Sequence, residues 1–594
     1  MPDAYEIANG LDPNIDDTAS DFDGDGTNNI TEYLSGTDPQ IDDYDPIITL
    51  NSNVIIPATG LLTPVPNNLA SASDGSQGNV DLTSDLSRTL LAPGRYVINW
   101  AAQDETGNTS NATQTLDVQP LANWQVDQNS SEGNTVTITL HLNGDAPSYP
   151  VVANYTVGGT AINPDDHDGV SGSLTISSGH EADISINVAS DATSEADETI
   201  EVTLDSISNA VIGVKALHTV TISEFNHAPT VELSAAIDSE PLNPIAVFST
   251  TDGPATITAN VSDVDPGDSH TYAWTDTNEL NGTISNGTYR FDPSSVQAGV
   301  YQLSVTATDD AFDPKSGAAA ITISIVESLP TLSAANDTDG DGIDDGTEGL
   351  GDEDNDGVPD YADNTNQANL LNLYPTDSAL QNEGWFMEAE AGLKIQLNLI
   401  STGTGDFSPL LSTGTLTSLN LSDETENGFS YNGGVYDFIV SNMPIAGENV
   451  FIVIPQLNAI PADASYRKYL DGEWFEFIED ANNRVYSAAG ALGACPPPGS
   501  SNYQLGLSEG HYCVQIEIQD GGPNDDDGVA NGIILDPGGV ALEVLTSDPI
   551  VPVVPSDSST STKEYRFGHG GGSMNLFMLL LLCVGGLIKY RSRS

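Results

Sequence analysis

Apolar and polar residues alternate along most of the chain, and a period of two predicts strands rather than helices. The clearest alternating run covers residues 95–102. Comparable runs predict strands at residues 113–118, 135–142, 255–261, 299–307, 435–440, 450–454 and 512–518. One short helix is expected at residues 29–34, where the sequence 36–39, Gly-Thr-Asp-Pro, ends it. The pattern therefore predicts a mostly β protein.

One apolar run departs from this alternation at the end of the chain. It covers residues 574–588, follows the cluster 570–573 (Gly-Gly-Gly-Ser), and is followed at once by Lys589, Arg591 and Arg593. The run is short, since a membrane span typically needs about 20 apolar residues. A buried core helix is the alternative. The position between a glycine cluster and a basic cluster favours a transmembrane helix whose basic end stays in the cytoplasm.

The sequence motif Asp-x-Asp-x-Asp-Gly occurs three times, and an acidic residue follows six positions after each glycine. This is the spacing of a twelve-residue calcium loop, with side-chain ligands at positions 1, 3 and 5, a turn glycine at 6, a backbone carbonyl at 7, a further ligand at 9 and a closing acid at 12. We call these loop 1 (residues 21–32), loop 2 (residues 337–348) and loop 3 (residues 352–363). The candidate ligands are Asp21, Asp23, Asp25, Thr27, Asn29 and Glu32 in loop 1, Asp337, Asp339, Asp341, Ile343, Asp345 and Glu348 in loop 2, and Asp352, Asp354, Asp356, Val358, Asp360 and Asp363 in loop 3.

The acid at position 12 distinguishes the three loops. Loops 1 and 2 carry Glu, which binds bidentately, whereas loop 3 carries the shorter Asp363 and is expected to bind calcium more weakly or differently. A solvated acidic linker is the alternative interpretation of all three segments.

Composition supports folded acidic domains. The chain has 594 residues, 87 acidic against 14 basic side chains, and a formal net charge of -73. Such a chain repels nucleic acid and anionic lipid, and it attracts divalent cations. Hydrophobic residues make up 38% of the chain, which is too many for a disordered polypeptide. At this length several domains are expected.

The acidic segments at residues 1–45 and 331–365 resemble thrombospondin type 3 repeats, in which successive Asp-rich loops wrap calcium ions. No long amphipathic helix flanks the loops, which argues against paired EF-hands. The resemblance implies stiff, calcium-dependent spacers. Residues 1–6, Met-Pro-Asp-Ala-Tyr-Glu, fit the second half of such a loop. We therefore expect the chain to be a fragment, or to start at an internal methionine, with a signal peptide on the true precursor; a cytoplasmic start with a chance match is the alternative.

Three stretches between the acidic segments resemble known sandwich families. Residues 46–119, with Trp100-x-Ala102-x-Asp104-x-x-Gly107-Asn108, resemble a hyalin-repeat (HYR) domain. Residues 227–327, with Tyr-Ala-Trp at 272–274 and the acidic turn 263–268, resemble a PKD or cadherin-like domain. Residues 120–226 resemble a Calx-β domain through the order of their Ser-Glu-Gly start, mid-domain acids and late acids. The resemblances imply tandem immunoglobulin-like sandwiches.

In Calx-β domains, acids at one end of the sandwich bind calcium. The resemblance carries this role to Glu132, Asp166, Asp191, Glu195 and Glu198. The sequence departs from the family pattern at two places. The tyrosine after the mid-domain aspartate is replaced by His167 or Asp168, and one late aspartate is replaced by Ala192. A solvated acidic loop end is the alternative.

The C-terminal part of the chain combines a β domain with a sorting signal. Residues 366–546 contain Cys495-Pro-Pro-Pro-Gly-Ser, His-Tyr-Cys513 and an acidic Gly-rich run at 520–528, and they resemble the bacterial choice-of-anchor U domain. Residues 547–569 are a Ser-, Pro- and Thr-rich stalk. Residues 570–594 resemble the GlyGly-CTERM signal of Gram-negative bacteria. That signal implies cleavage by a rhombosortase-type protease and delivery to the surface through type II secretion.

The cysteines agree with export. Cys583 lies in the apolar run, which leaves Cys495 and Cys513 in one β-rich domain. In an oxidising compartment these two are expected to form one disulfide, and two buried thiols are the alternative.

The sequence favours a surface-displayed, calcium-stiffened adhesion or interaction protein that binds an unidentified protein or glycan. It contains no His-Glu-x-x-His, no Gly-x-Ser-x-Gly and no phosphate loop, so we expect no catalytic activity. One alternative is a carbohydrate-binding accessory or a secreted hydrolase component, with a platform made of Trp385, Trp474 and Tyr469; core packing is the other reading of these aromatics. A surface-layer structural protein is the remaining alternative.

Overall fold

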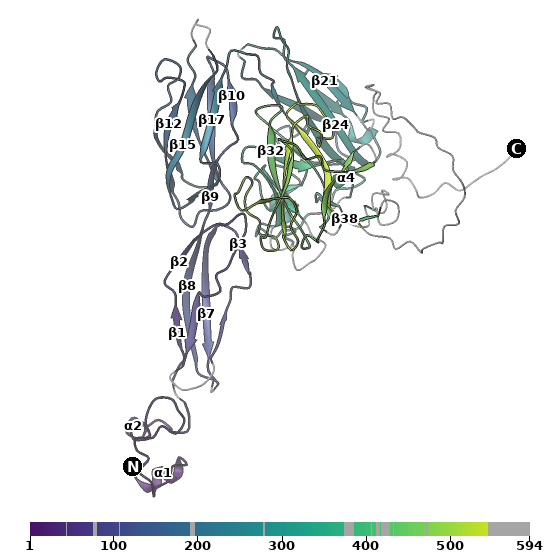
Figure 1. Cartoon of the computed structure of the whole chain (residues 1–594). Helices are drawn as coiled ribbons and strands as arrows, with labels where there is room; N and C mark the ends of the chain where they lie inside the picture. The colour runs from purple at the N-terminus through teal and green to yellow at the C-terminus, as the bar shows by residue number, and fades with distance from the viewer. Residues whose placement is uncertain are drawn as a thin grey trace, which may run out of the picture. The chain divides into compact units, whose positions relative to one another are not determined.

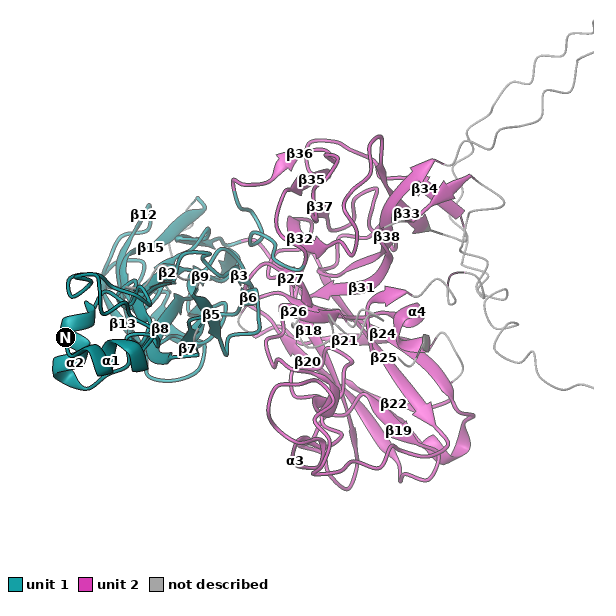
Figure 2. Ribbon diagram, turned by 90° about the horizontal axis from the view of Figure 1, so that it is seen from below, with its two compact units in different colours: residues 1–224, 493–500 teal, residues 225–492, 501–594 magenta. Residues whose placement is uncertain are grey.

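The computed structural model describes residues 1–543, apart from residues 43, 75–79, 106, 191–195, 266, 277–279, 374–384, 405–406, 412–415, 417–427, 432 and 471–472. Strands dominate it and helices are short, so the predicted mostly β fold is confirmed (Figure 1). The chain divides into two units, residues 1–224 with 493–500 and the remainder from residue 225 (Figure 2). The two units are described separately.

Unit 1 begins with the acidic segment and its two helices, α1 (Asp3–Ala8) and α2 (Asn29–Ser35). The side chain of Asn28 accepts the backbone N–H of Thr31 and caps the start of α2. Gly36 ends the helix with a left-handed φ of 81°. The helix predicted at residues 29–34 is therefore confirmed, together with its glycine stop.

The first β region of unit 1 is built around a four-stranded sheet in the order β2-β8-β7-β5. Along β7, buried positions recur on one face, and Ile98 packs with Leu116 and Leu91 in the core. The strands are β1 (Ile47–Leu50), β2 (Val54–Pro57), β3 (Thr63–Pro64), β4 (Ala70–Ser73), β5 (Asp81–Ser84), β6 (Leu90–Leu91), β7 (Gly94–Gln103) and β8 (Thr109–Gln119), of which β1 pairs with β4 and β3 with β6.

The second β region of unit 1 has two sheets, in the orders β10-β17-β15-β12-β13 and β14-β11-β9-β16. Ile138 of one sheet and Ile200 of the other belong to the same buried cluster, with Trp124 at 0% exposure, so the sheets pack face to face. The strands are β9 (Leu121–Trp124), β10 (Gln128–Ser130), β11 (Thr135–Leu142), β12 (Val151–Gly159), β13 (Gly172–Ile176), β14 (Glu181–Asn187), β15 (Glu198–Ser208), β16 (Val211–Ile212) and β17 (Leu217–Ile222).

Unit 2 begins with another pair of sheets, in the orders β18-β20-β23-β22 and β19-β25-β24-β21. Phe248 and Phe291 meet edge to face at 5.4 Å between ring centroids and join the two sheets. The elements are β18 (Thr230–Ile237), β19 (Val247–Ser249), β20 (Ala255–Ser262), β21 (Thr271–Asp276), β22 (Thr283–Ser285), β23 (Thr288–Phe291), the 3₁₀ turn η1 (Pro293–Ser295), β24 (Gly299–Thr308) and β25 (Ser316–Val326).

The last β region has two larger sheets, in the orders β26-β27-β32-β37-β35-β36 and β28-β31-β38-β33-β34. Strand β31 is buried at every position, because both of its faces are covered. The elements are α3 (Asp345–Glu348), η2 (Asp360–Ala362), β26 (Leu370–Leu373), β27 (Trp385–Ala389), β28 (Lys394–Leu397), α4 (Leu399–Thr404), β29 (Leu410–Leu411), β30 (Phe429–Ser430), β31 (Val435–Ser441), β32 (Asn449–Pro455), β33 (Ser465–Leu470), β34 (Glu473–Glu476), β35 (Arg484–Ala488), β36 (Gln504–Leu505), β37 (Cys513–Gln519) and β38 (Ile534–Glu543); β29 pairs with β31 and β30 with β38.

The strands predicted from alternation all occur, with ends displaced by a few residues. Each sheet draws its strands from one of the ranges 46–119, 120–226, 227–327 and 366–546. Cys495 and Cys513 are disulfide-bonded. Among the described residues no helix is long and apolar enough to cross a membrane. The predicted stalk at 547–569 and the predicted transmembrane helix and sorting signal at 570–594 lie outside the described residues.

Candidate metal centres

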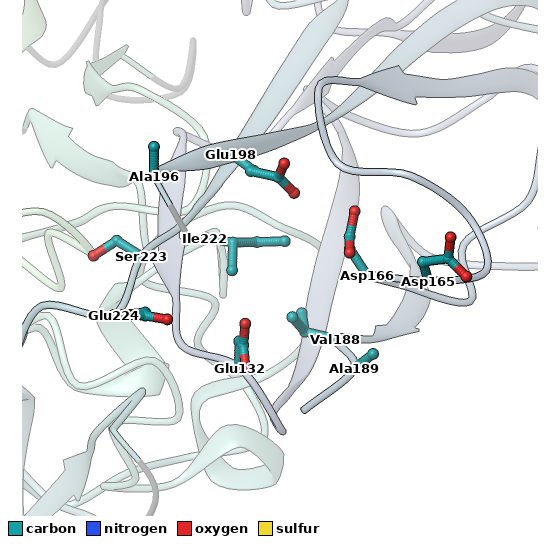
Figure 3. A pocket seen from close by; sticks show the side chains of 10 residues that line it. All are labelled: Glu132, Asp165, Asp166, Val188, Ala189, Ala196, Glu198, Ile222, Ser223 and Glu224. Atoms are coloured by element: carbon teal, nitrogen blue, oxygen red, sulfur yellow. The ribbon is translucent and has the colours of Figure 1, made fainter. Parts of the chain in front are cut away.

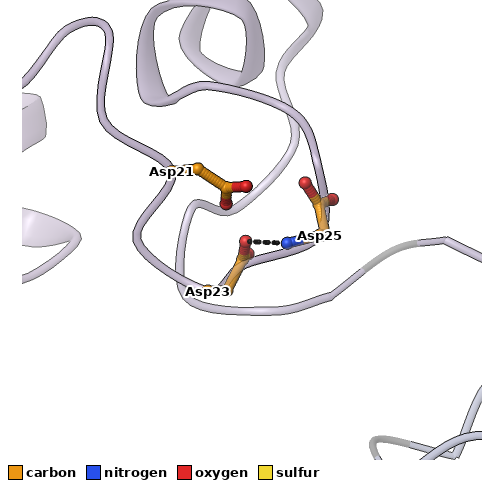
Figure 4. Close-up of side chains that lie close together, drawn as sticks. All are labelled: Asp21, Asp23 and Asp25. Atoms are coloured by element: carbon orange, nitrogen blue, oxygen red, sulfur yellow. Dashed lines mark hydrogen bonds between the residues drawn. The ribbon is translucent and has the colours of Figure 1, made fainter. Parts of the chain in front are cut away.

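Loop 1 gathers three carboxylates around one point (Figure 4). The oxygens offered by Asp21, Asp23 and Asp25 all lie within 4.8 Å of one another. The loop's own backbone holds them there: Asp21 accepts the N–H of Gly24 at 2.7 Å, Asp23 accepts that of Asp25 at 3.2 Å, and Asp25 accepts that of Thr27 at 2.6 Å. Because each carboxylate folds back onto a residue two or three places later, all three converge.

Loops 2 and 3 repeat this scheme. In loop 2, Asp337 accepts from Gly340, Asp339 from Asp341 and Asp341 from Ile343. In loop 3, Asp352 and Asp354 both accept from Asp356, and Asp356 accepts from Val358 at 2.7 Å. Each trio again has its oxygens within 4.8 Å of one another. The glycines at position 6 have φ of 92°, 98° and 91°, a left-handed conformation that favours glycine.

In each of the three loops, the same carboxylate oxygen accepts no hydrogen bond from the described residues. Oδ2 of the position-3 aspartate (Asp23, Asp339 and Asp354) is buried and has no hydrogen-bond partner among the described residues. In loop 3, Oδ2 of Asp356 is also buried without a partner, and that residue is 0% exposed. A buried carboxylate oxygen without a partner is costly, and a cation removes the cost. Oxygen-only donor sets of this kind suit Ca²⁺.

The carboxyl groups perturb one another strongly. Burial raises the pKa of Asp339 to about 6, and burial with the neighbouring aspartates raises the pKa of Glu348 to about 7. In loop 3, burial raises the pKa of Asp352 and of Asp356 well above the ordinary value, and the neighbouring Asp354 raises both further. These shifts mark sites that accommodate several negative charges poorly unless a cation is present.

The position-12 acids face the same centres in loops 2 and 3. Asp339 is the first neighbour that raises the pKa of Glu348, and Asp363 contributes to the raised pKa of Asp356. Glu32, at the same position in loop 1, is 1% exposed. Asp363 also accepts a hydrogen bond from Asn372 at 2.7 Å, which fixes the shorter side chain in place.

The side chains at position 9 form hydrogen bonds within their own loops. Asn29 accepts the N–H of Phe22, Asp345 that of Thr338, and Asp360 that of Glu353, so each one holds the second residue of its own loop. The side-chain amide of Asn29 also donates to the carbonyl of Asp17, so both its oxygen and its nitrogen form hydrogen bonds to the backbone. The predicted ligation by these side chains stays a prediction. At position 7, Thr27, Ile343 and Val358 donate their N–H to the position-5 aspartate, and their predicted carbonyl ligation stays a prediction.

Loop 3 is not a free spacer. The N–H of Asp352 donates to the carbonyl of Pro244 in the sandwich before it, and the carbonyl of Asp356 accepts the N–H of Leu397 in β28. Asp352, Asp356 and Asp363 are 5%, 0% and 5% exposed. The alternative of a solvated acidic linker therefore does not fit loop 3, because tertiary packing encloses it within unit 2.

A further acidic pocket lies at one end of the second β region of unit 1 (Figure 3). Glu132, Asp166 and Glu198 point into it, as expected from the Calx-β resemblance, and Asp165 and Glu224 also line it. Asp166 is held by the N–H of Ile162 at 2.6 Å. The other two predicted ligands, Asp191 and Glu195, lie outside the described residues. Of the two candidate replacements for the family's tyrosine, His167 is buried, and Asp168 accepts two hydrogen bonds from Asn187.

Two acidic clusters were not among the predicted sites. Asp42, Asp74 and Asp104 place oxygens within 4.8 Å of one another, although they come from three separate segments, and no spacing in the sequence indicated this. Asp263, Asp265 and Asp268 form the other cluster. Two of these are engaged by histidines, Asp263 by His270 at 2.7 Å and Asp265 by His227 at 3.2 Å. The acidic turn 263–268 was the available signal.

The three aromatics of the hypothetical carbohydrate platform do not share one environment. Trp385 is 1% exposed and belongs to the core. Trp474 lies 4.4 Å from Tyr431 and 5.3 Å from Tyr469, measured between ring centroids, and the three rings pack against one another. Core packing is therefore confirmed for Trp385, whereas Trp474 and Tyr469 are half-buried, and a role in carbohydrate binding stays a hypothesis for these two.

Comparisons with known proteins add little. No protein-family model matches the chain, and no curated protein matches it. Among solved structures, the chain is similar to the crystal structure of the apo form of the Calx CBD1 domain, with 24% identity over 17% of this chain and 96% of that chain and a TM-score of 0.16.

Proposed function

We propose that this chain is an exported, calcium-binding, multidomain protein of the cell surface that serves in adhesion or interaction rather than catalysis. The observation that carries the calcium part is the equivalent buried, unpartnered oxygen of Asp23, Asp339 and Asp354 in three loops of identical spacing. Such an arrangement arising three times by chance is implausible, and a divalent cation satisfies all three oxygens at once.

Calcium here has a mechanical role. Each loop lacks a long helix or sheet of its own, so its residues are ordered mainly by the hydrogen bonds of the carboxylates and by the cation they surround. Binding ties positions 1, 3, 5 and 12 to one point and removes their mutual repulsion. In loop 3 the same event ties Asp352, next to Pro244, to Asp356, next to Leu397, and so stiffens the junction of two β regions inside unit 2.

The surface part of the proposal rests on the sequence. The order of glycine cluster, apolar run and basic end at residues 570–594 supports insertion through residues 574–588, cleavage by a rhombosortase-like protease and type II secretion to the surface of a Gram-negative bacterium. The excess of 87 acidic over 14 basic residues disfavours nucleic acid as a partner. The ligand is a protein or a glycan outside the cell.

Calorimetric titration of the calcium-depleted chain tests the metal sites. We expect at least three calcium ions per chain, and Asp339→Ala should remove one of them. Asp292→Ala is the matched control, because Asp292 caps the 3₁₀ turn η1 away from the acidic clusters. A stoichiometry that is unaffected by Asp339→Ala would contradict the assignment of loop 2.

Adhesion is tested separately. The purified chain is applied to glycan arrays and to immobilised extracellular proteins, in calcium and in chelator. Saturable, calcium-dependent binding to one class supports the proposal. Ordered two-dimensional assembly of the pure protein, without binding to either class, would favour a surface-layer role instead.

A further inference from the structure

The last β region contains a buried lysine–aspartate pair that the calcium proposal does not use. Nζ of Lys468, in β33, lies 2.5 Å from Oδ1 of Asp536, in β38. The side chains are 2% and 0% exposed. This separation is below the range of about 2.7–2.9 Å that is normal for a hydrogen bond between an ammonium and a carboxylate.

The pair has no other polar support. Nζ of Lys468 and both carboxyl oxygens of Asp536 are buried without a hydrogen-bond partner within the described parts of the chain. An ordinary buried ion pair needs such partners, because the ammonium protons and carboxylate lone pairs that remain carry a desolvation penalty. A very short contact without that support is therefore poorly explained as an ion pair.

The backbone brings the two groups together. Lys468 lies opposite Gly538 in the β33–β38 ladder, and Asp536 lies two residues before Gly538 on the same strand face. A Cβ at position 538 would lie 2.9 Å from Oδ1 of Asp536 and 2.9 Å from Cε1 of Tyr466. A side chain at this place would collide with the carboxyl group of Asp536 and with the ring of Tyr466, and glycine avoids this collision.

The surroundings of Asp536 favour its uncharged form. Phe438 lies opposite Asp536 in the neighbouring strand, and Tyr466 is 3% exposed. Burial raises the pKa of Asp536, and Lys468 opposes that rise. These surroundings favour a carboxylic acid over a carboxylate at position 536.

We propose that Lys468 and Asp536 condense to an intramolecular amide that links β33 covalently to β38. One proton passes from the ammonium to the carboxylate, the lone pair of Nζ then attacks Cγ of the carboxylic acid, and a C–N bond forms. One C–O bond breaks, and that oxygen leaves as water with one proton from the carboxyl group and one from the amine. The products are a neutral secondary amide and one water molecule, and no oxidant or cofactor takes part. The reaction removes both buried charges.

Two other lysines provide internal comparisons. Lys315 lies 2.7 Å from Asp313, but these side chains are 43% and 78% exposed. Lys394 is buried, but it lies 3.8 Å from the half-exposed Glu232. In neither pair are both side chains buried and the nitrogen also close to the carboxylate oxygen, so neither pair is expected to form an amide.

Intact mass measurement of the full chain, denatured and with its disulfide reduced, tests the proposal. We expect a mass one water molecule below that of the sequence. Protease digestion should give one branched peptide carrying Lys468 and Asp536, and an amine-reactive reagent applied after denaturation should label Lys315 but not Lys468. A full sequence mass with Lys468 labelled as completely as Lys315 would overturn the proposal, and this measurement on the natural chain needs no variant to fold.

Variants then assign the bond. Lys468→Arg keeps the positive charge but has no attacking amine, and it should restore the missing water, as should Asp536→Ala. Lys315→Arg should leave the loss of water unchanged. Persistence of the loss in Lys468→Arg would show that the condensation lies elsewhere and would refute the assignment.

Discussion

Replacing Asp356 by Asn should change stability in opposite directions with and without calcium. Asp356 is 0% exposed, and its Oδ1 accepts the N–H of Val358 at 2.7 Å, a bond that the amide oxygen of Asn retains. Its Oδ2 is the atom left without a partner. The substitution thus removes one negative charge from loop 3 with almost no change of shape.

The magnitude follows from the spacing. The oxygens of Asp352, Asp354 and Asp356 lie within 4.8 Å of one another. At an effective dielectric constant of about 20, two unit charges at that distance repel by about 3.5 kcal/mol. Asp356 takes part in two such pairs, which gives about 7 kcal/mol or more when all three groups are ionised. Proton uptake relieves much of this, since burial and the neighbouring acids already raise the pKa of Asp356. A net gain of about 2–3 kcal/mol remains in the metal-free state.

With calcium the sign reverses. A neutral amide is a weaker ligand than a carboxylate, and we expect the affinity for calcium to fall by more than about 100-fold, because a loss of that size, about 2.7 kcal/mol, is needed to outweigh the metal-free gain. Scanning calorimetry of the full chain measures both states. In chelator, the transition of unit 2 should rise by about 5–10 °C in the variant. In excess calcium it should fall.

The control is Asp292→Asn, which makes the same charge change at a capping residue and retains the cap. Its transition temperature should differ little from the parent in either condition. If Asp356→Asn lowers stability in chelator as much as in calcium, the carboxylates of loop 3 do not repel one another and the metal-site reasoning fails.

Three other predictions concern different parts of the chain. Burial raises the pKa of Glu388 from 4.5 to about 8, so the folded state holds a proton that the unfolded state has lost. The free energy of unfolding should therefore fall as the pH rises from about 4.5 to 8, by at most about 5 kcal/mol. Denaturant unfolding at several pH values should show this slope, and an unchanged slope in Glu388→Gln would contradict it. Reducing the disulfide of Cys495 and Cys513 should destabilise the last β region by roughly 3 kcal/mol, and equal urea midpoints for the parent and the Cys495→Ser/Cys513→Ser variant would refute this. Replacing Gly571 and Gly572 with Leu should trap uncut protein in the inner membrane. Cleavage of the parent protein is checked by identifying the C-terminal peptide of protein extracted from the surface. A peptide that still contains Leu579 to Tyr590 would indicate an ordinary anchor.

The local features of this protein are encoded in short stretches of sequence. Asp21, Asp23 and Asp25 converge because each carboxylate binds a backbone N–H two or three residues later, so spacing alone predicts the cluster. Strands such as β11 (Thr135–Leu142) follow from alternation, because one buried face imposes a period of two. The short helix α2 was equally predictable, since its cap and its glycine stop are its own neighbours.

Tertiary structure alone decided the rest. Asp42, Asp74 and Asp104 meet only because β4 and β7 bring distant turns together. Loop 3 has the same ligand spacing as loop 1, yet packing against Pro244 and Leu397 buries it, and this burial raises the pKa of Asp356 well above the ordinary value. The sequence neighbours of Lys468 and Asp536 give no sign of their contact. The register of β33 and β38 places the two side chains next to each other, beside Gly538. Sequence spacing determines contacts over a few residues, where the backbone itself sets the geometry; contacts between distant segments, and the burial that sets their chemistry, depend on how the sheets pair and pack.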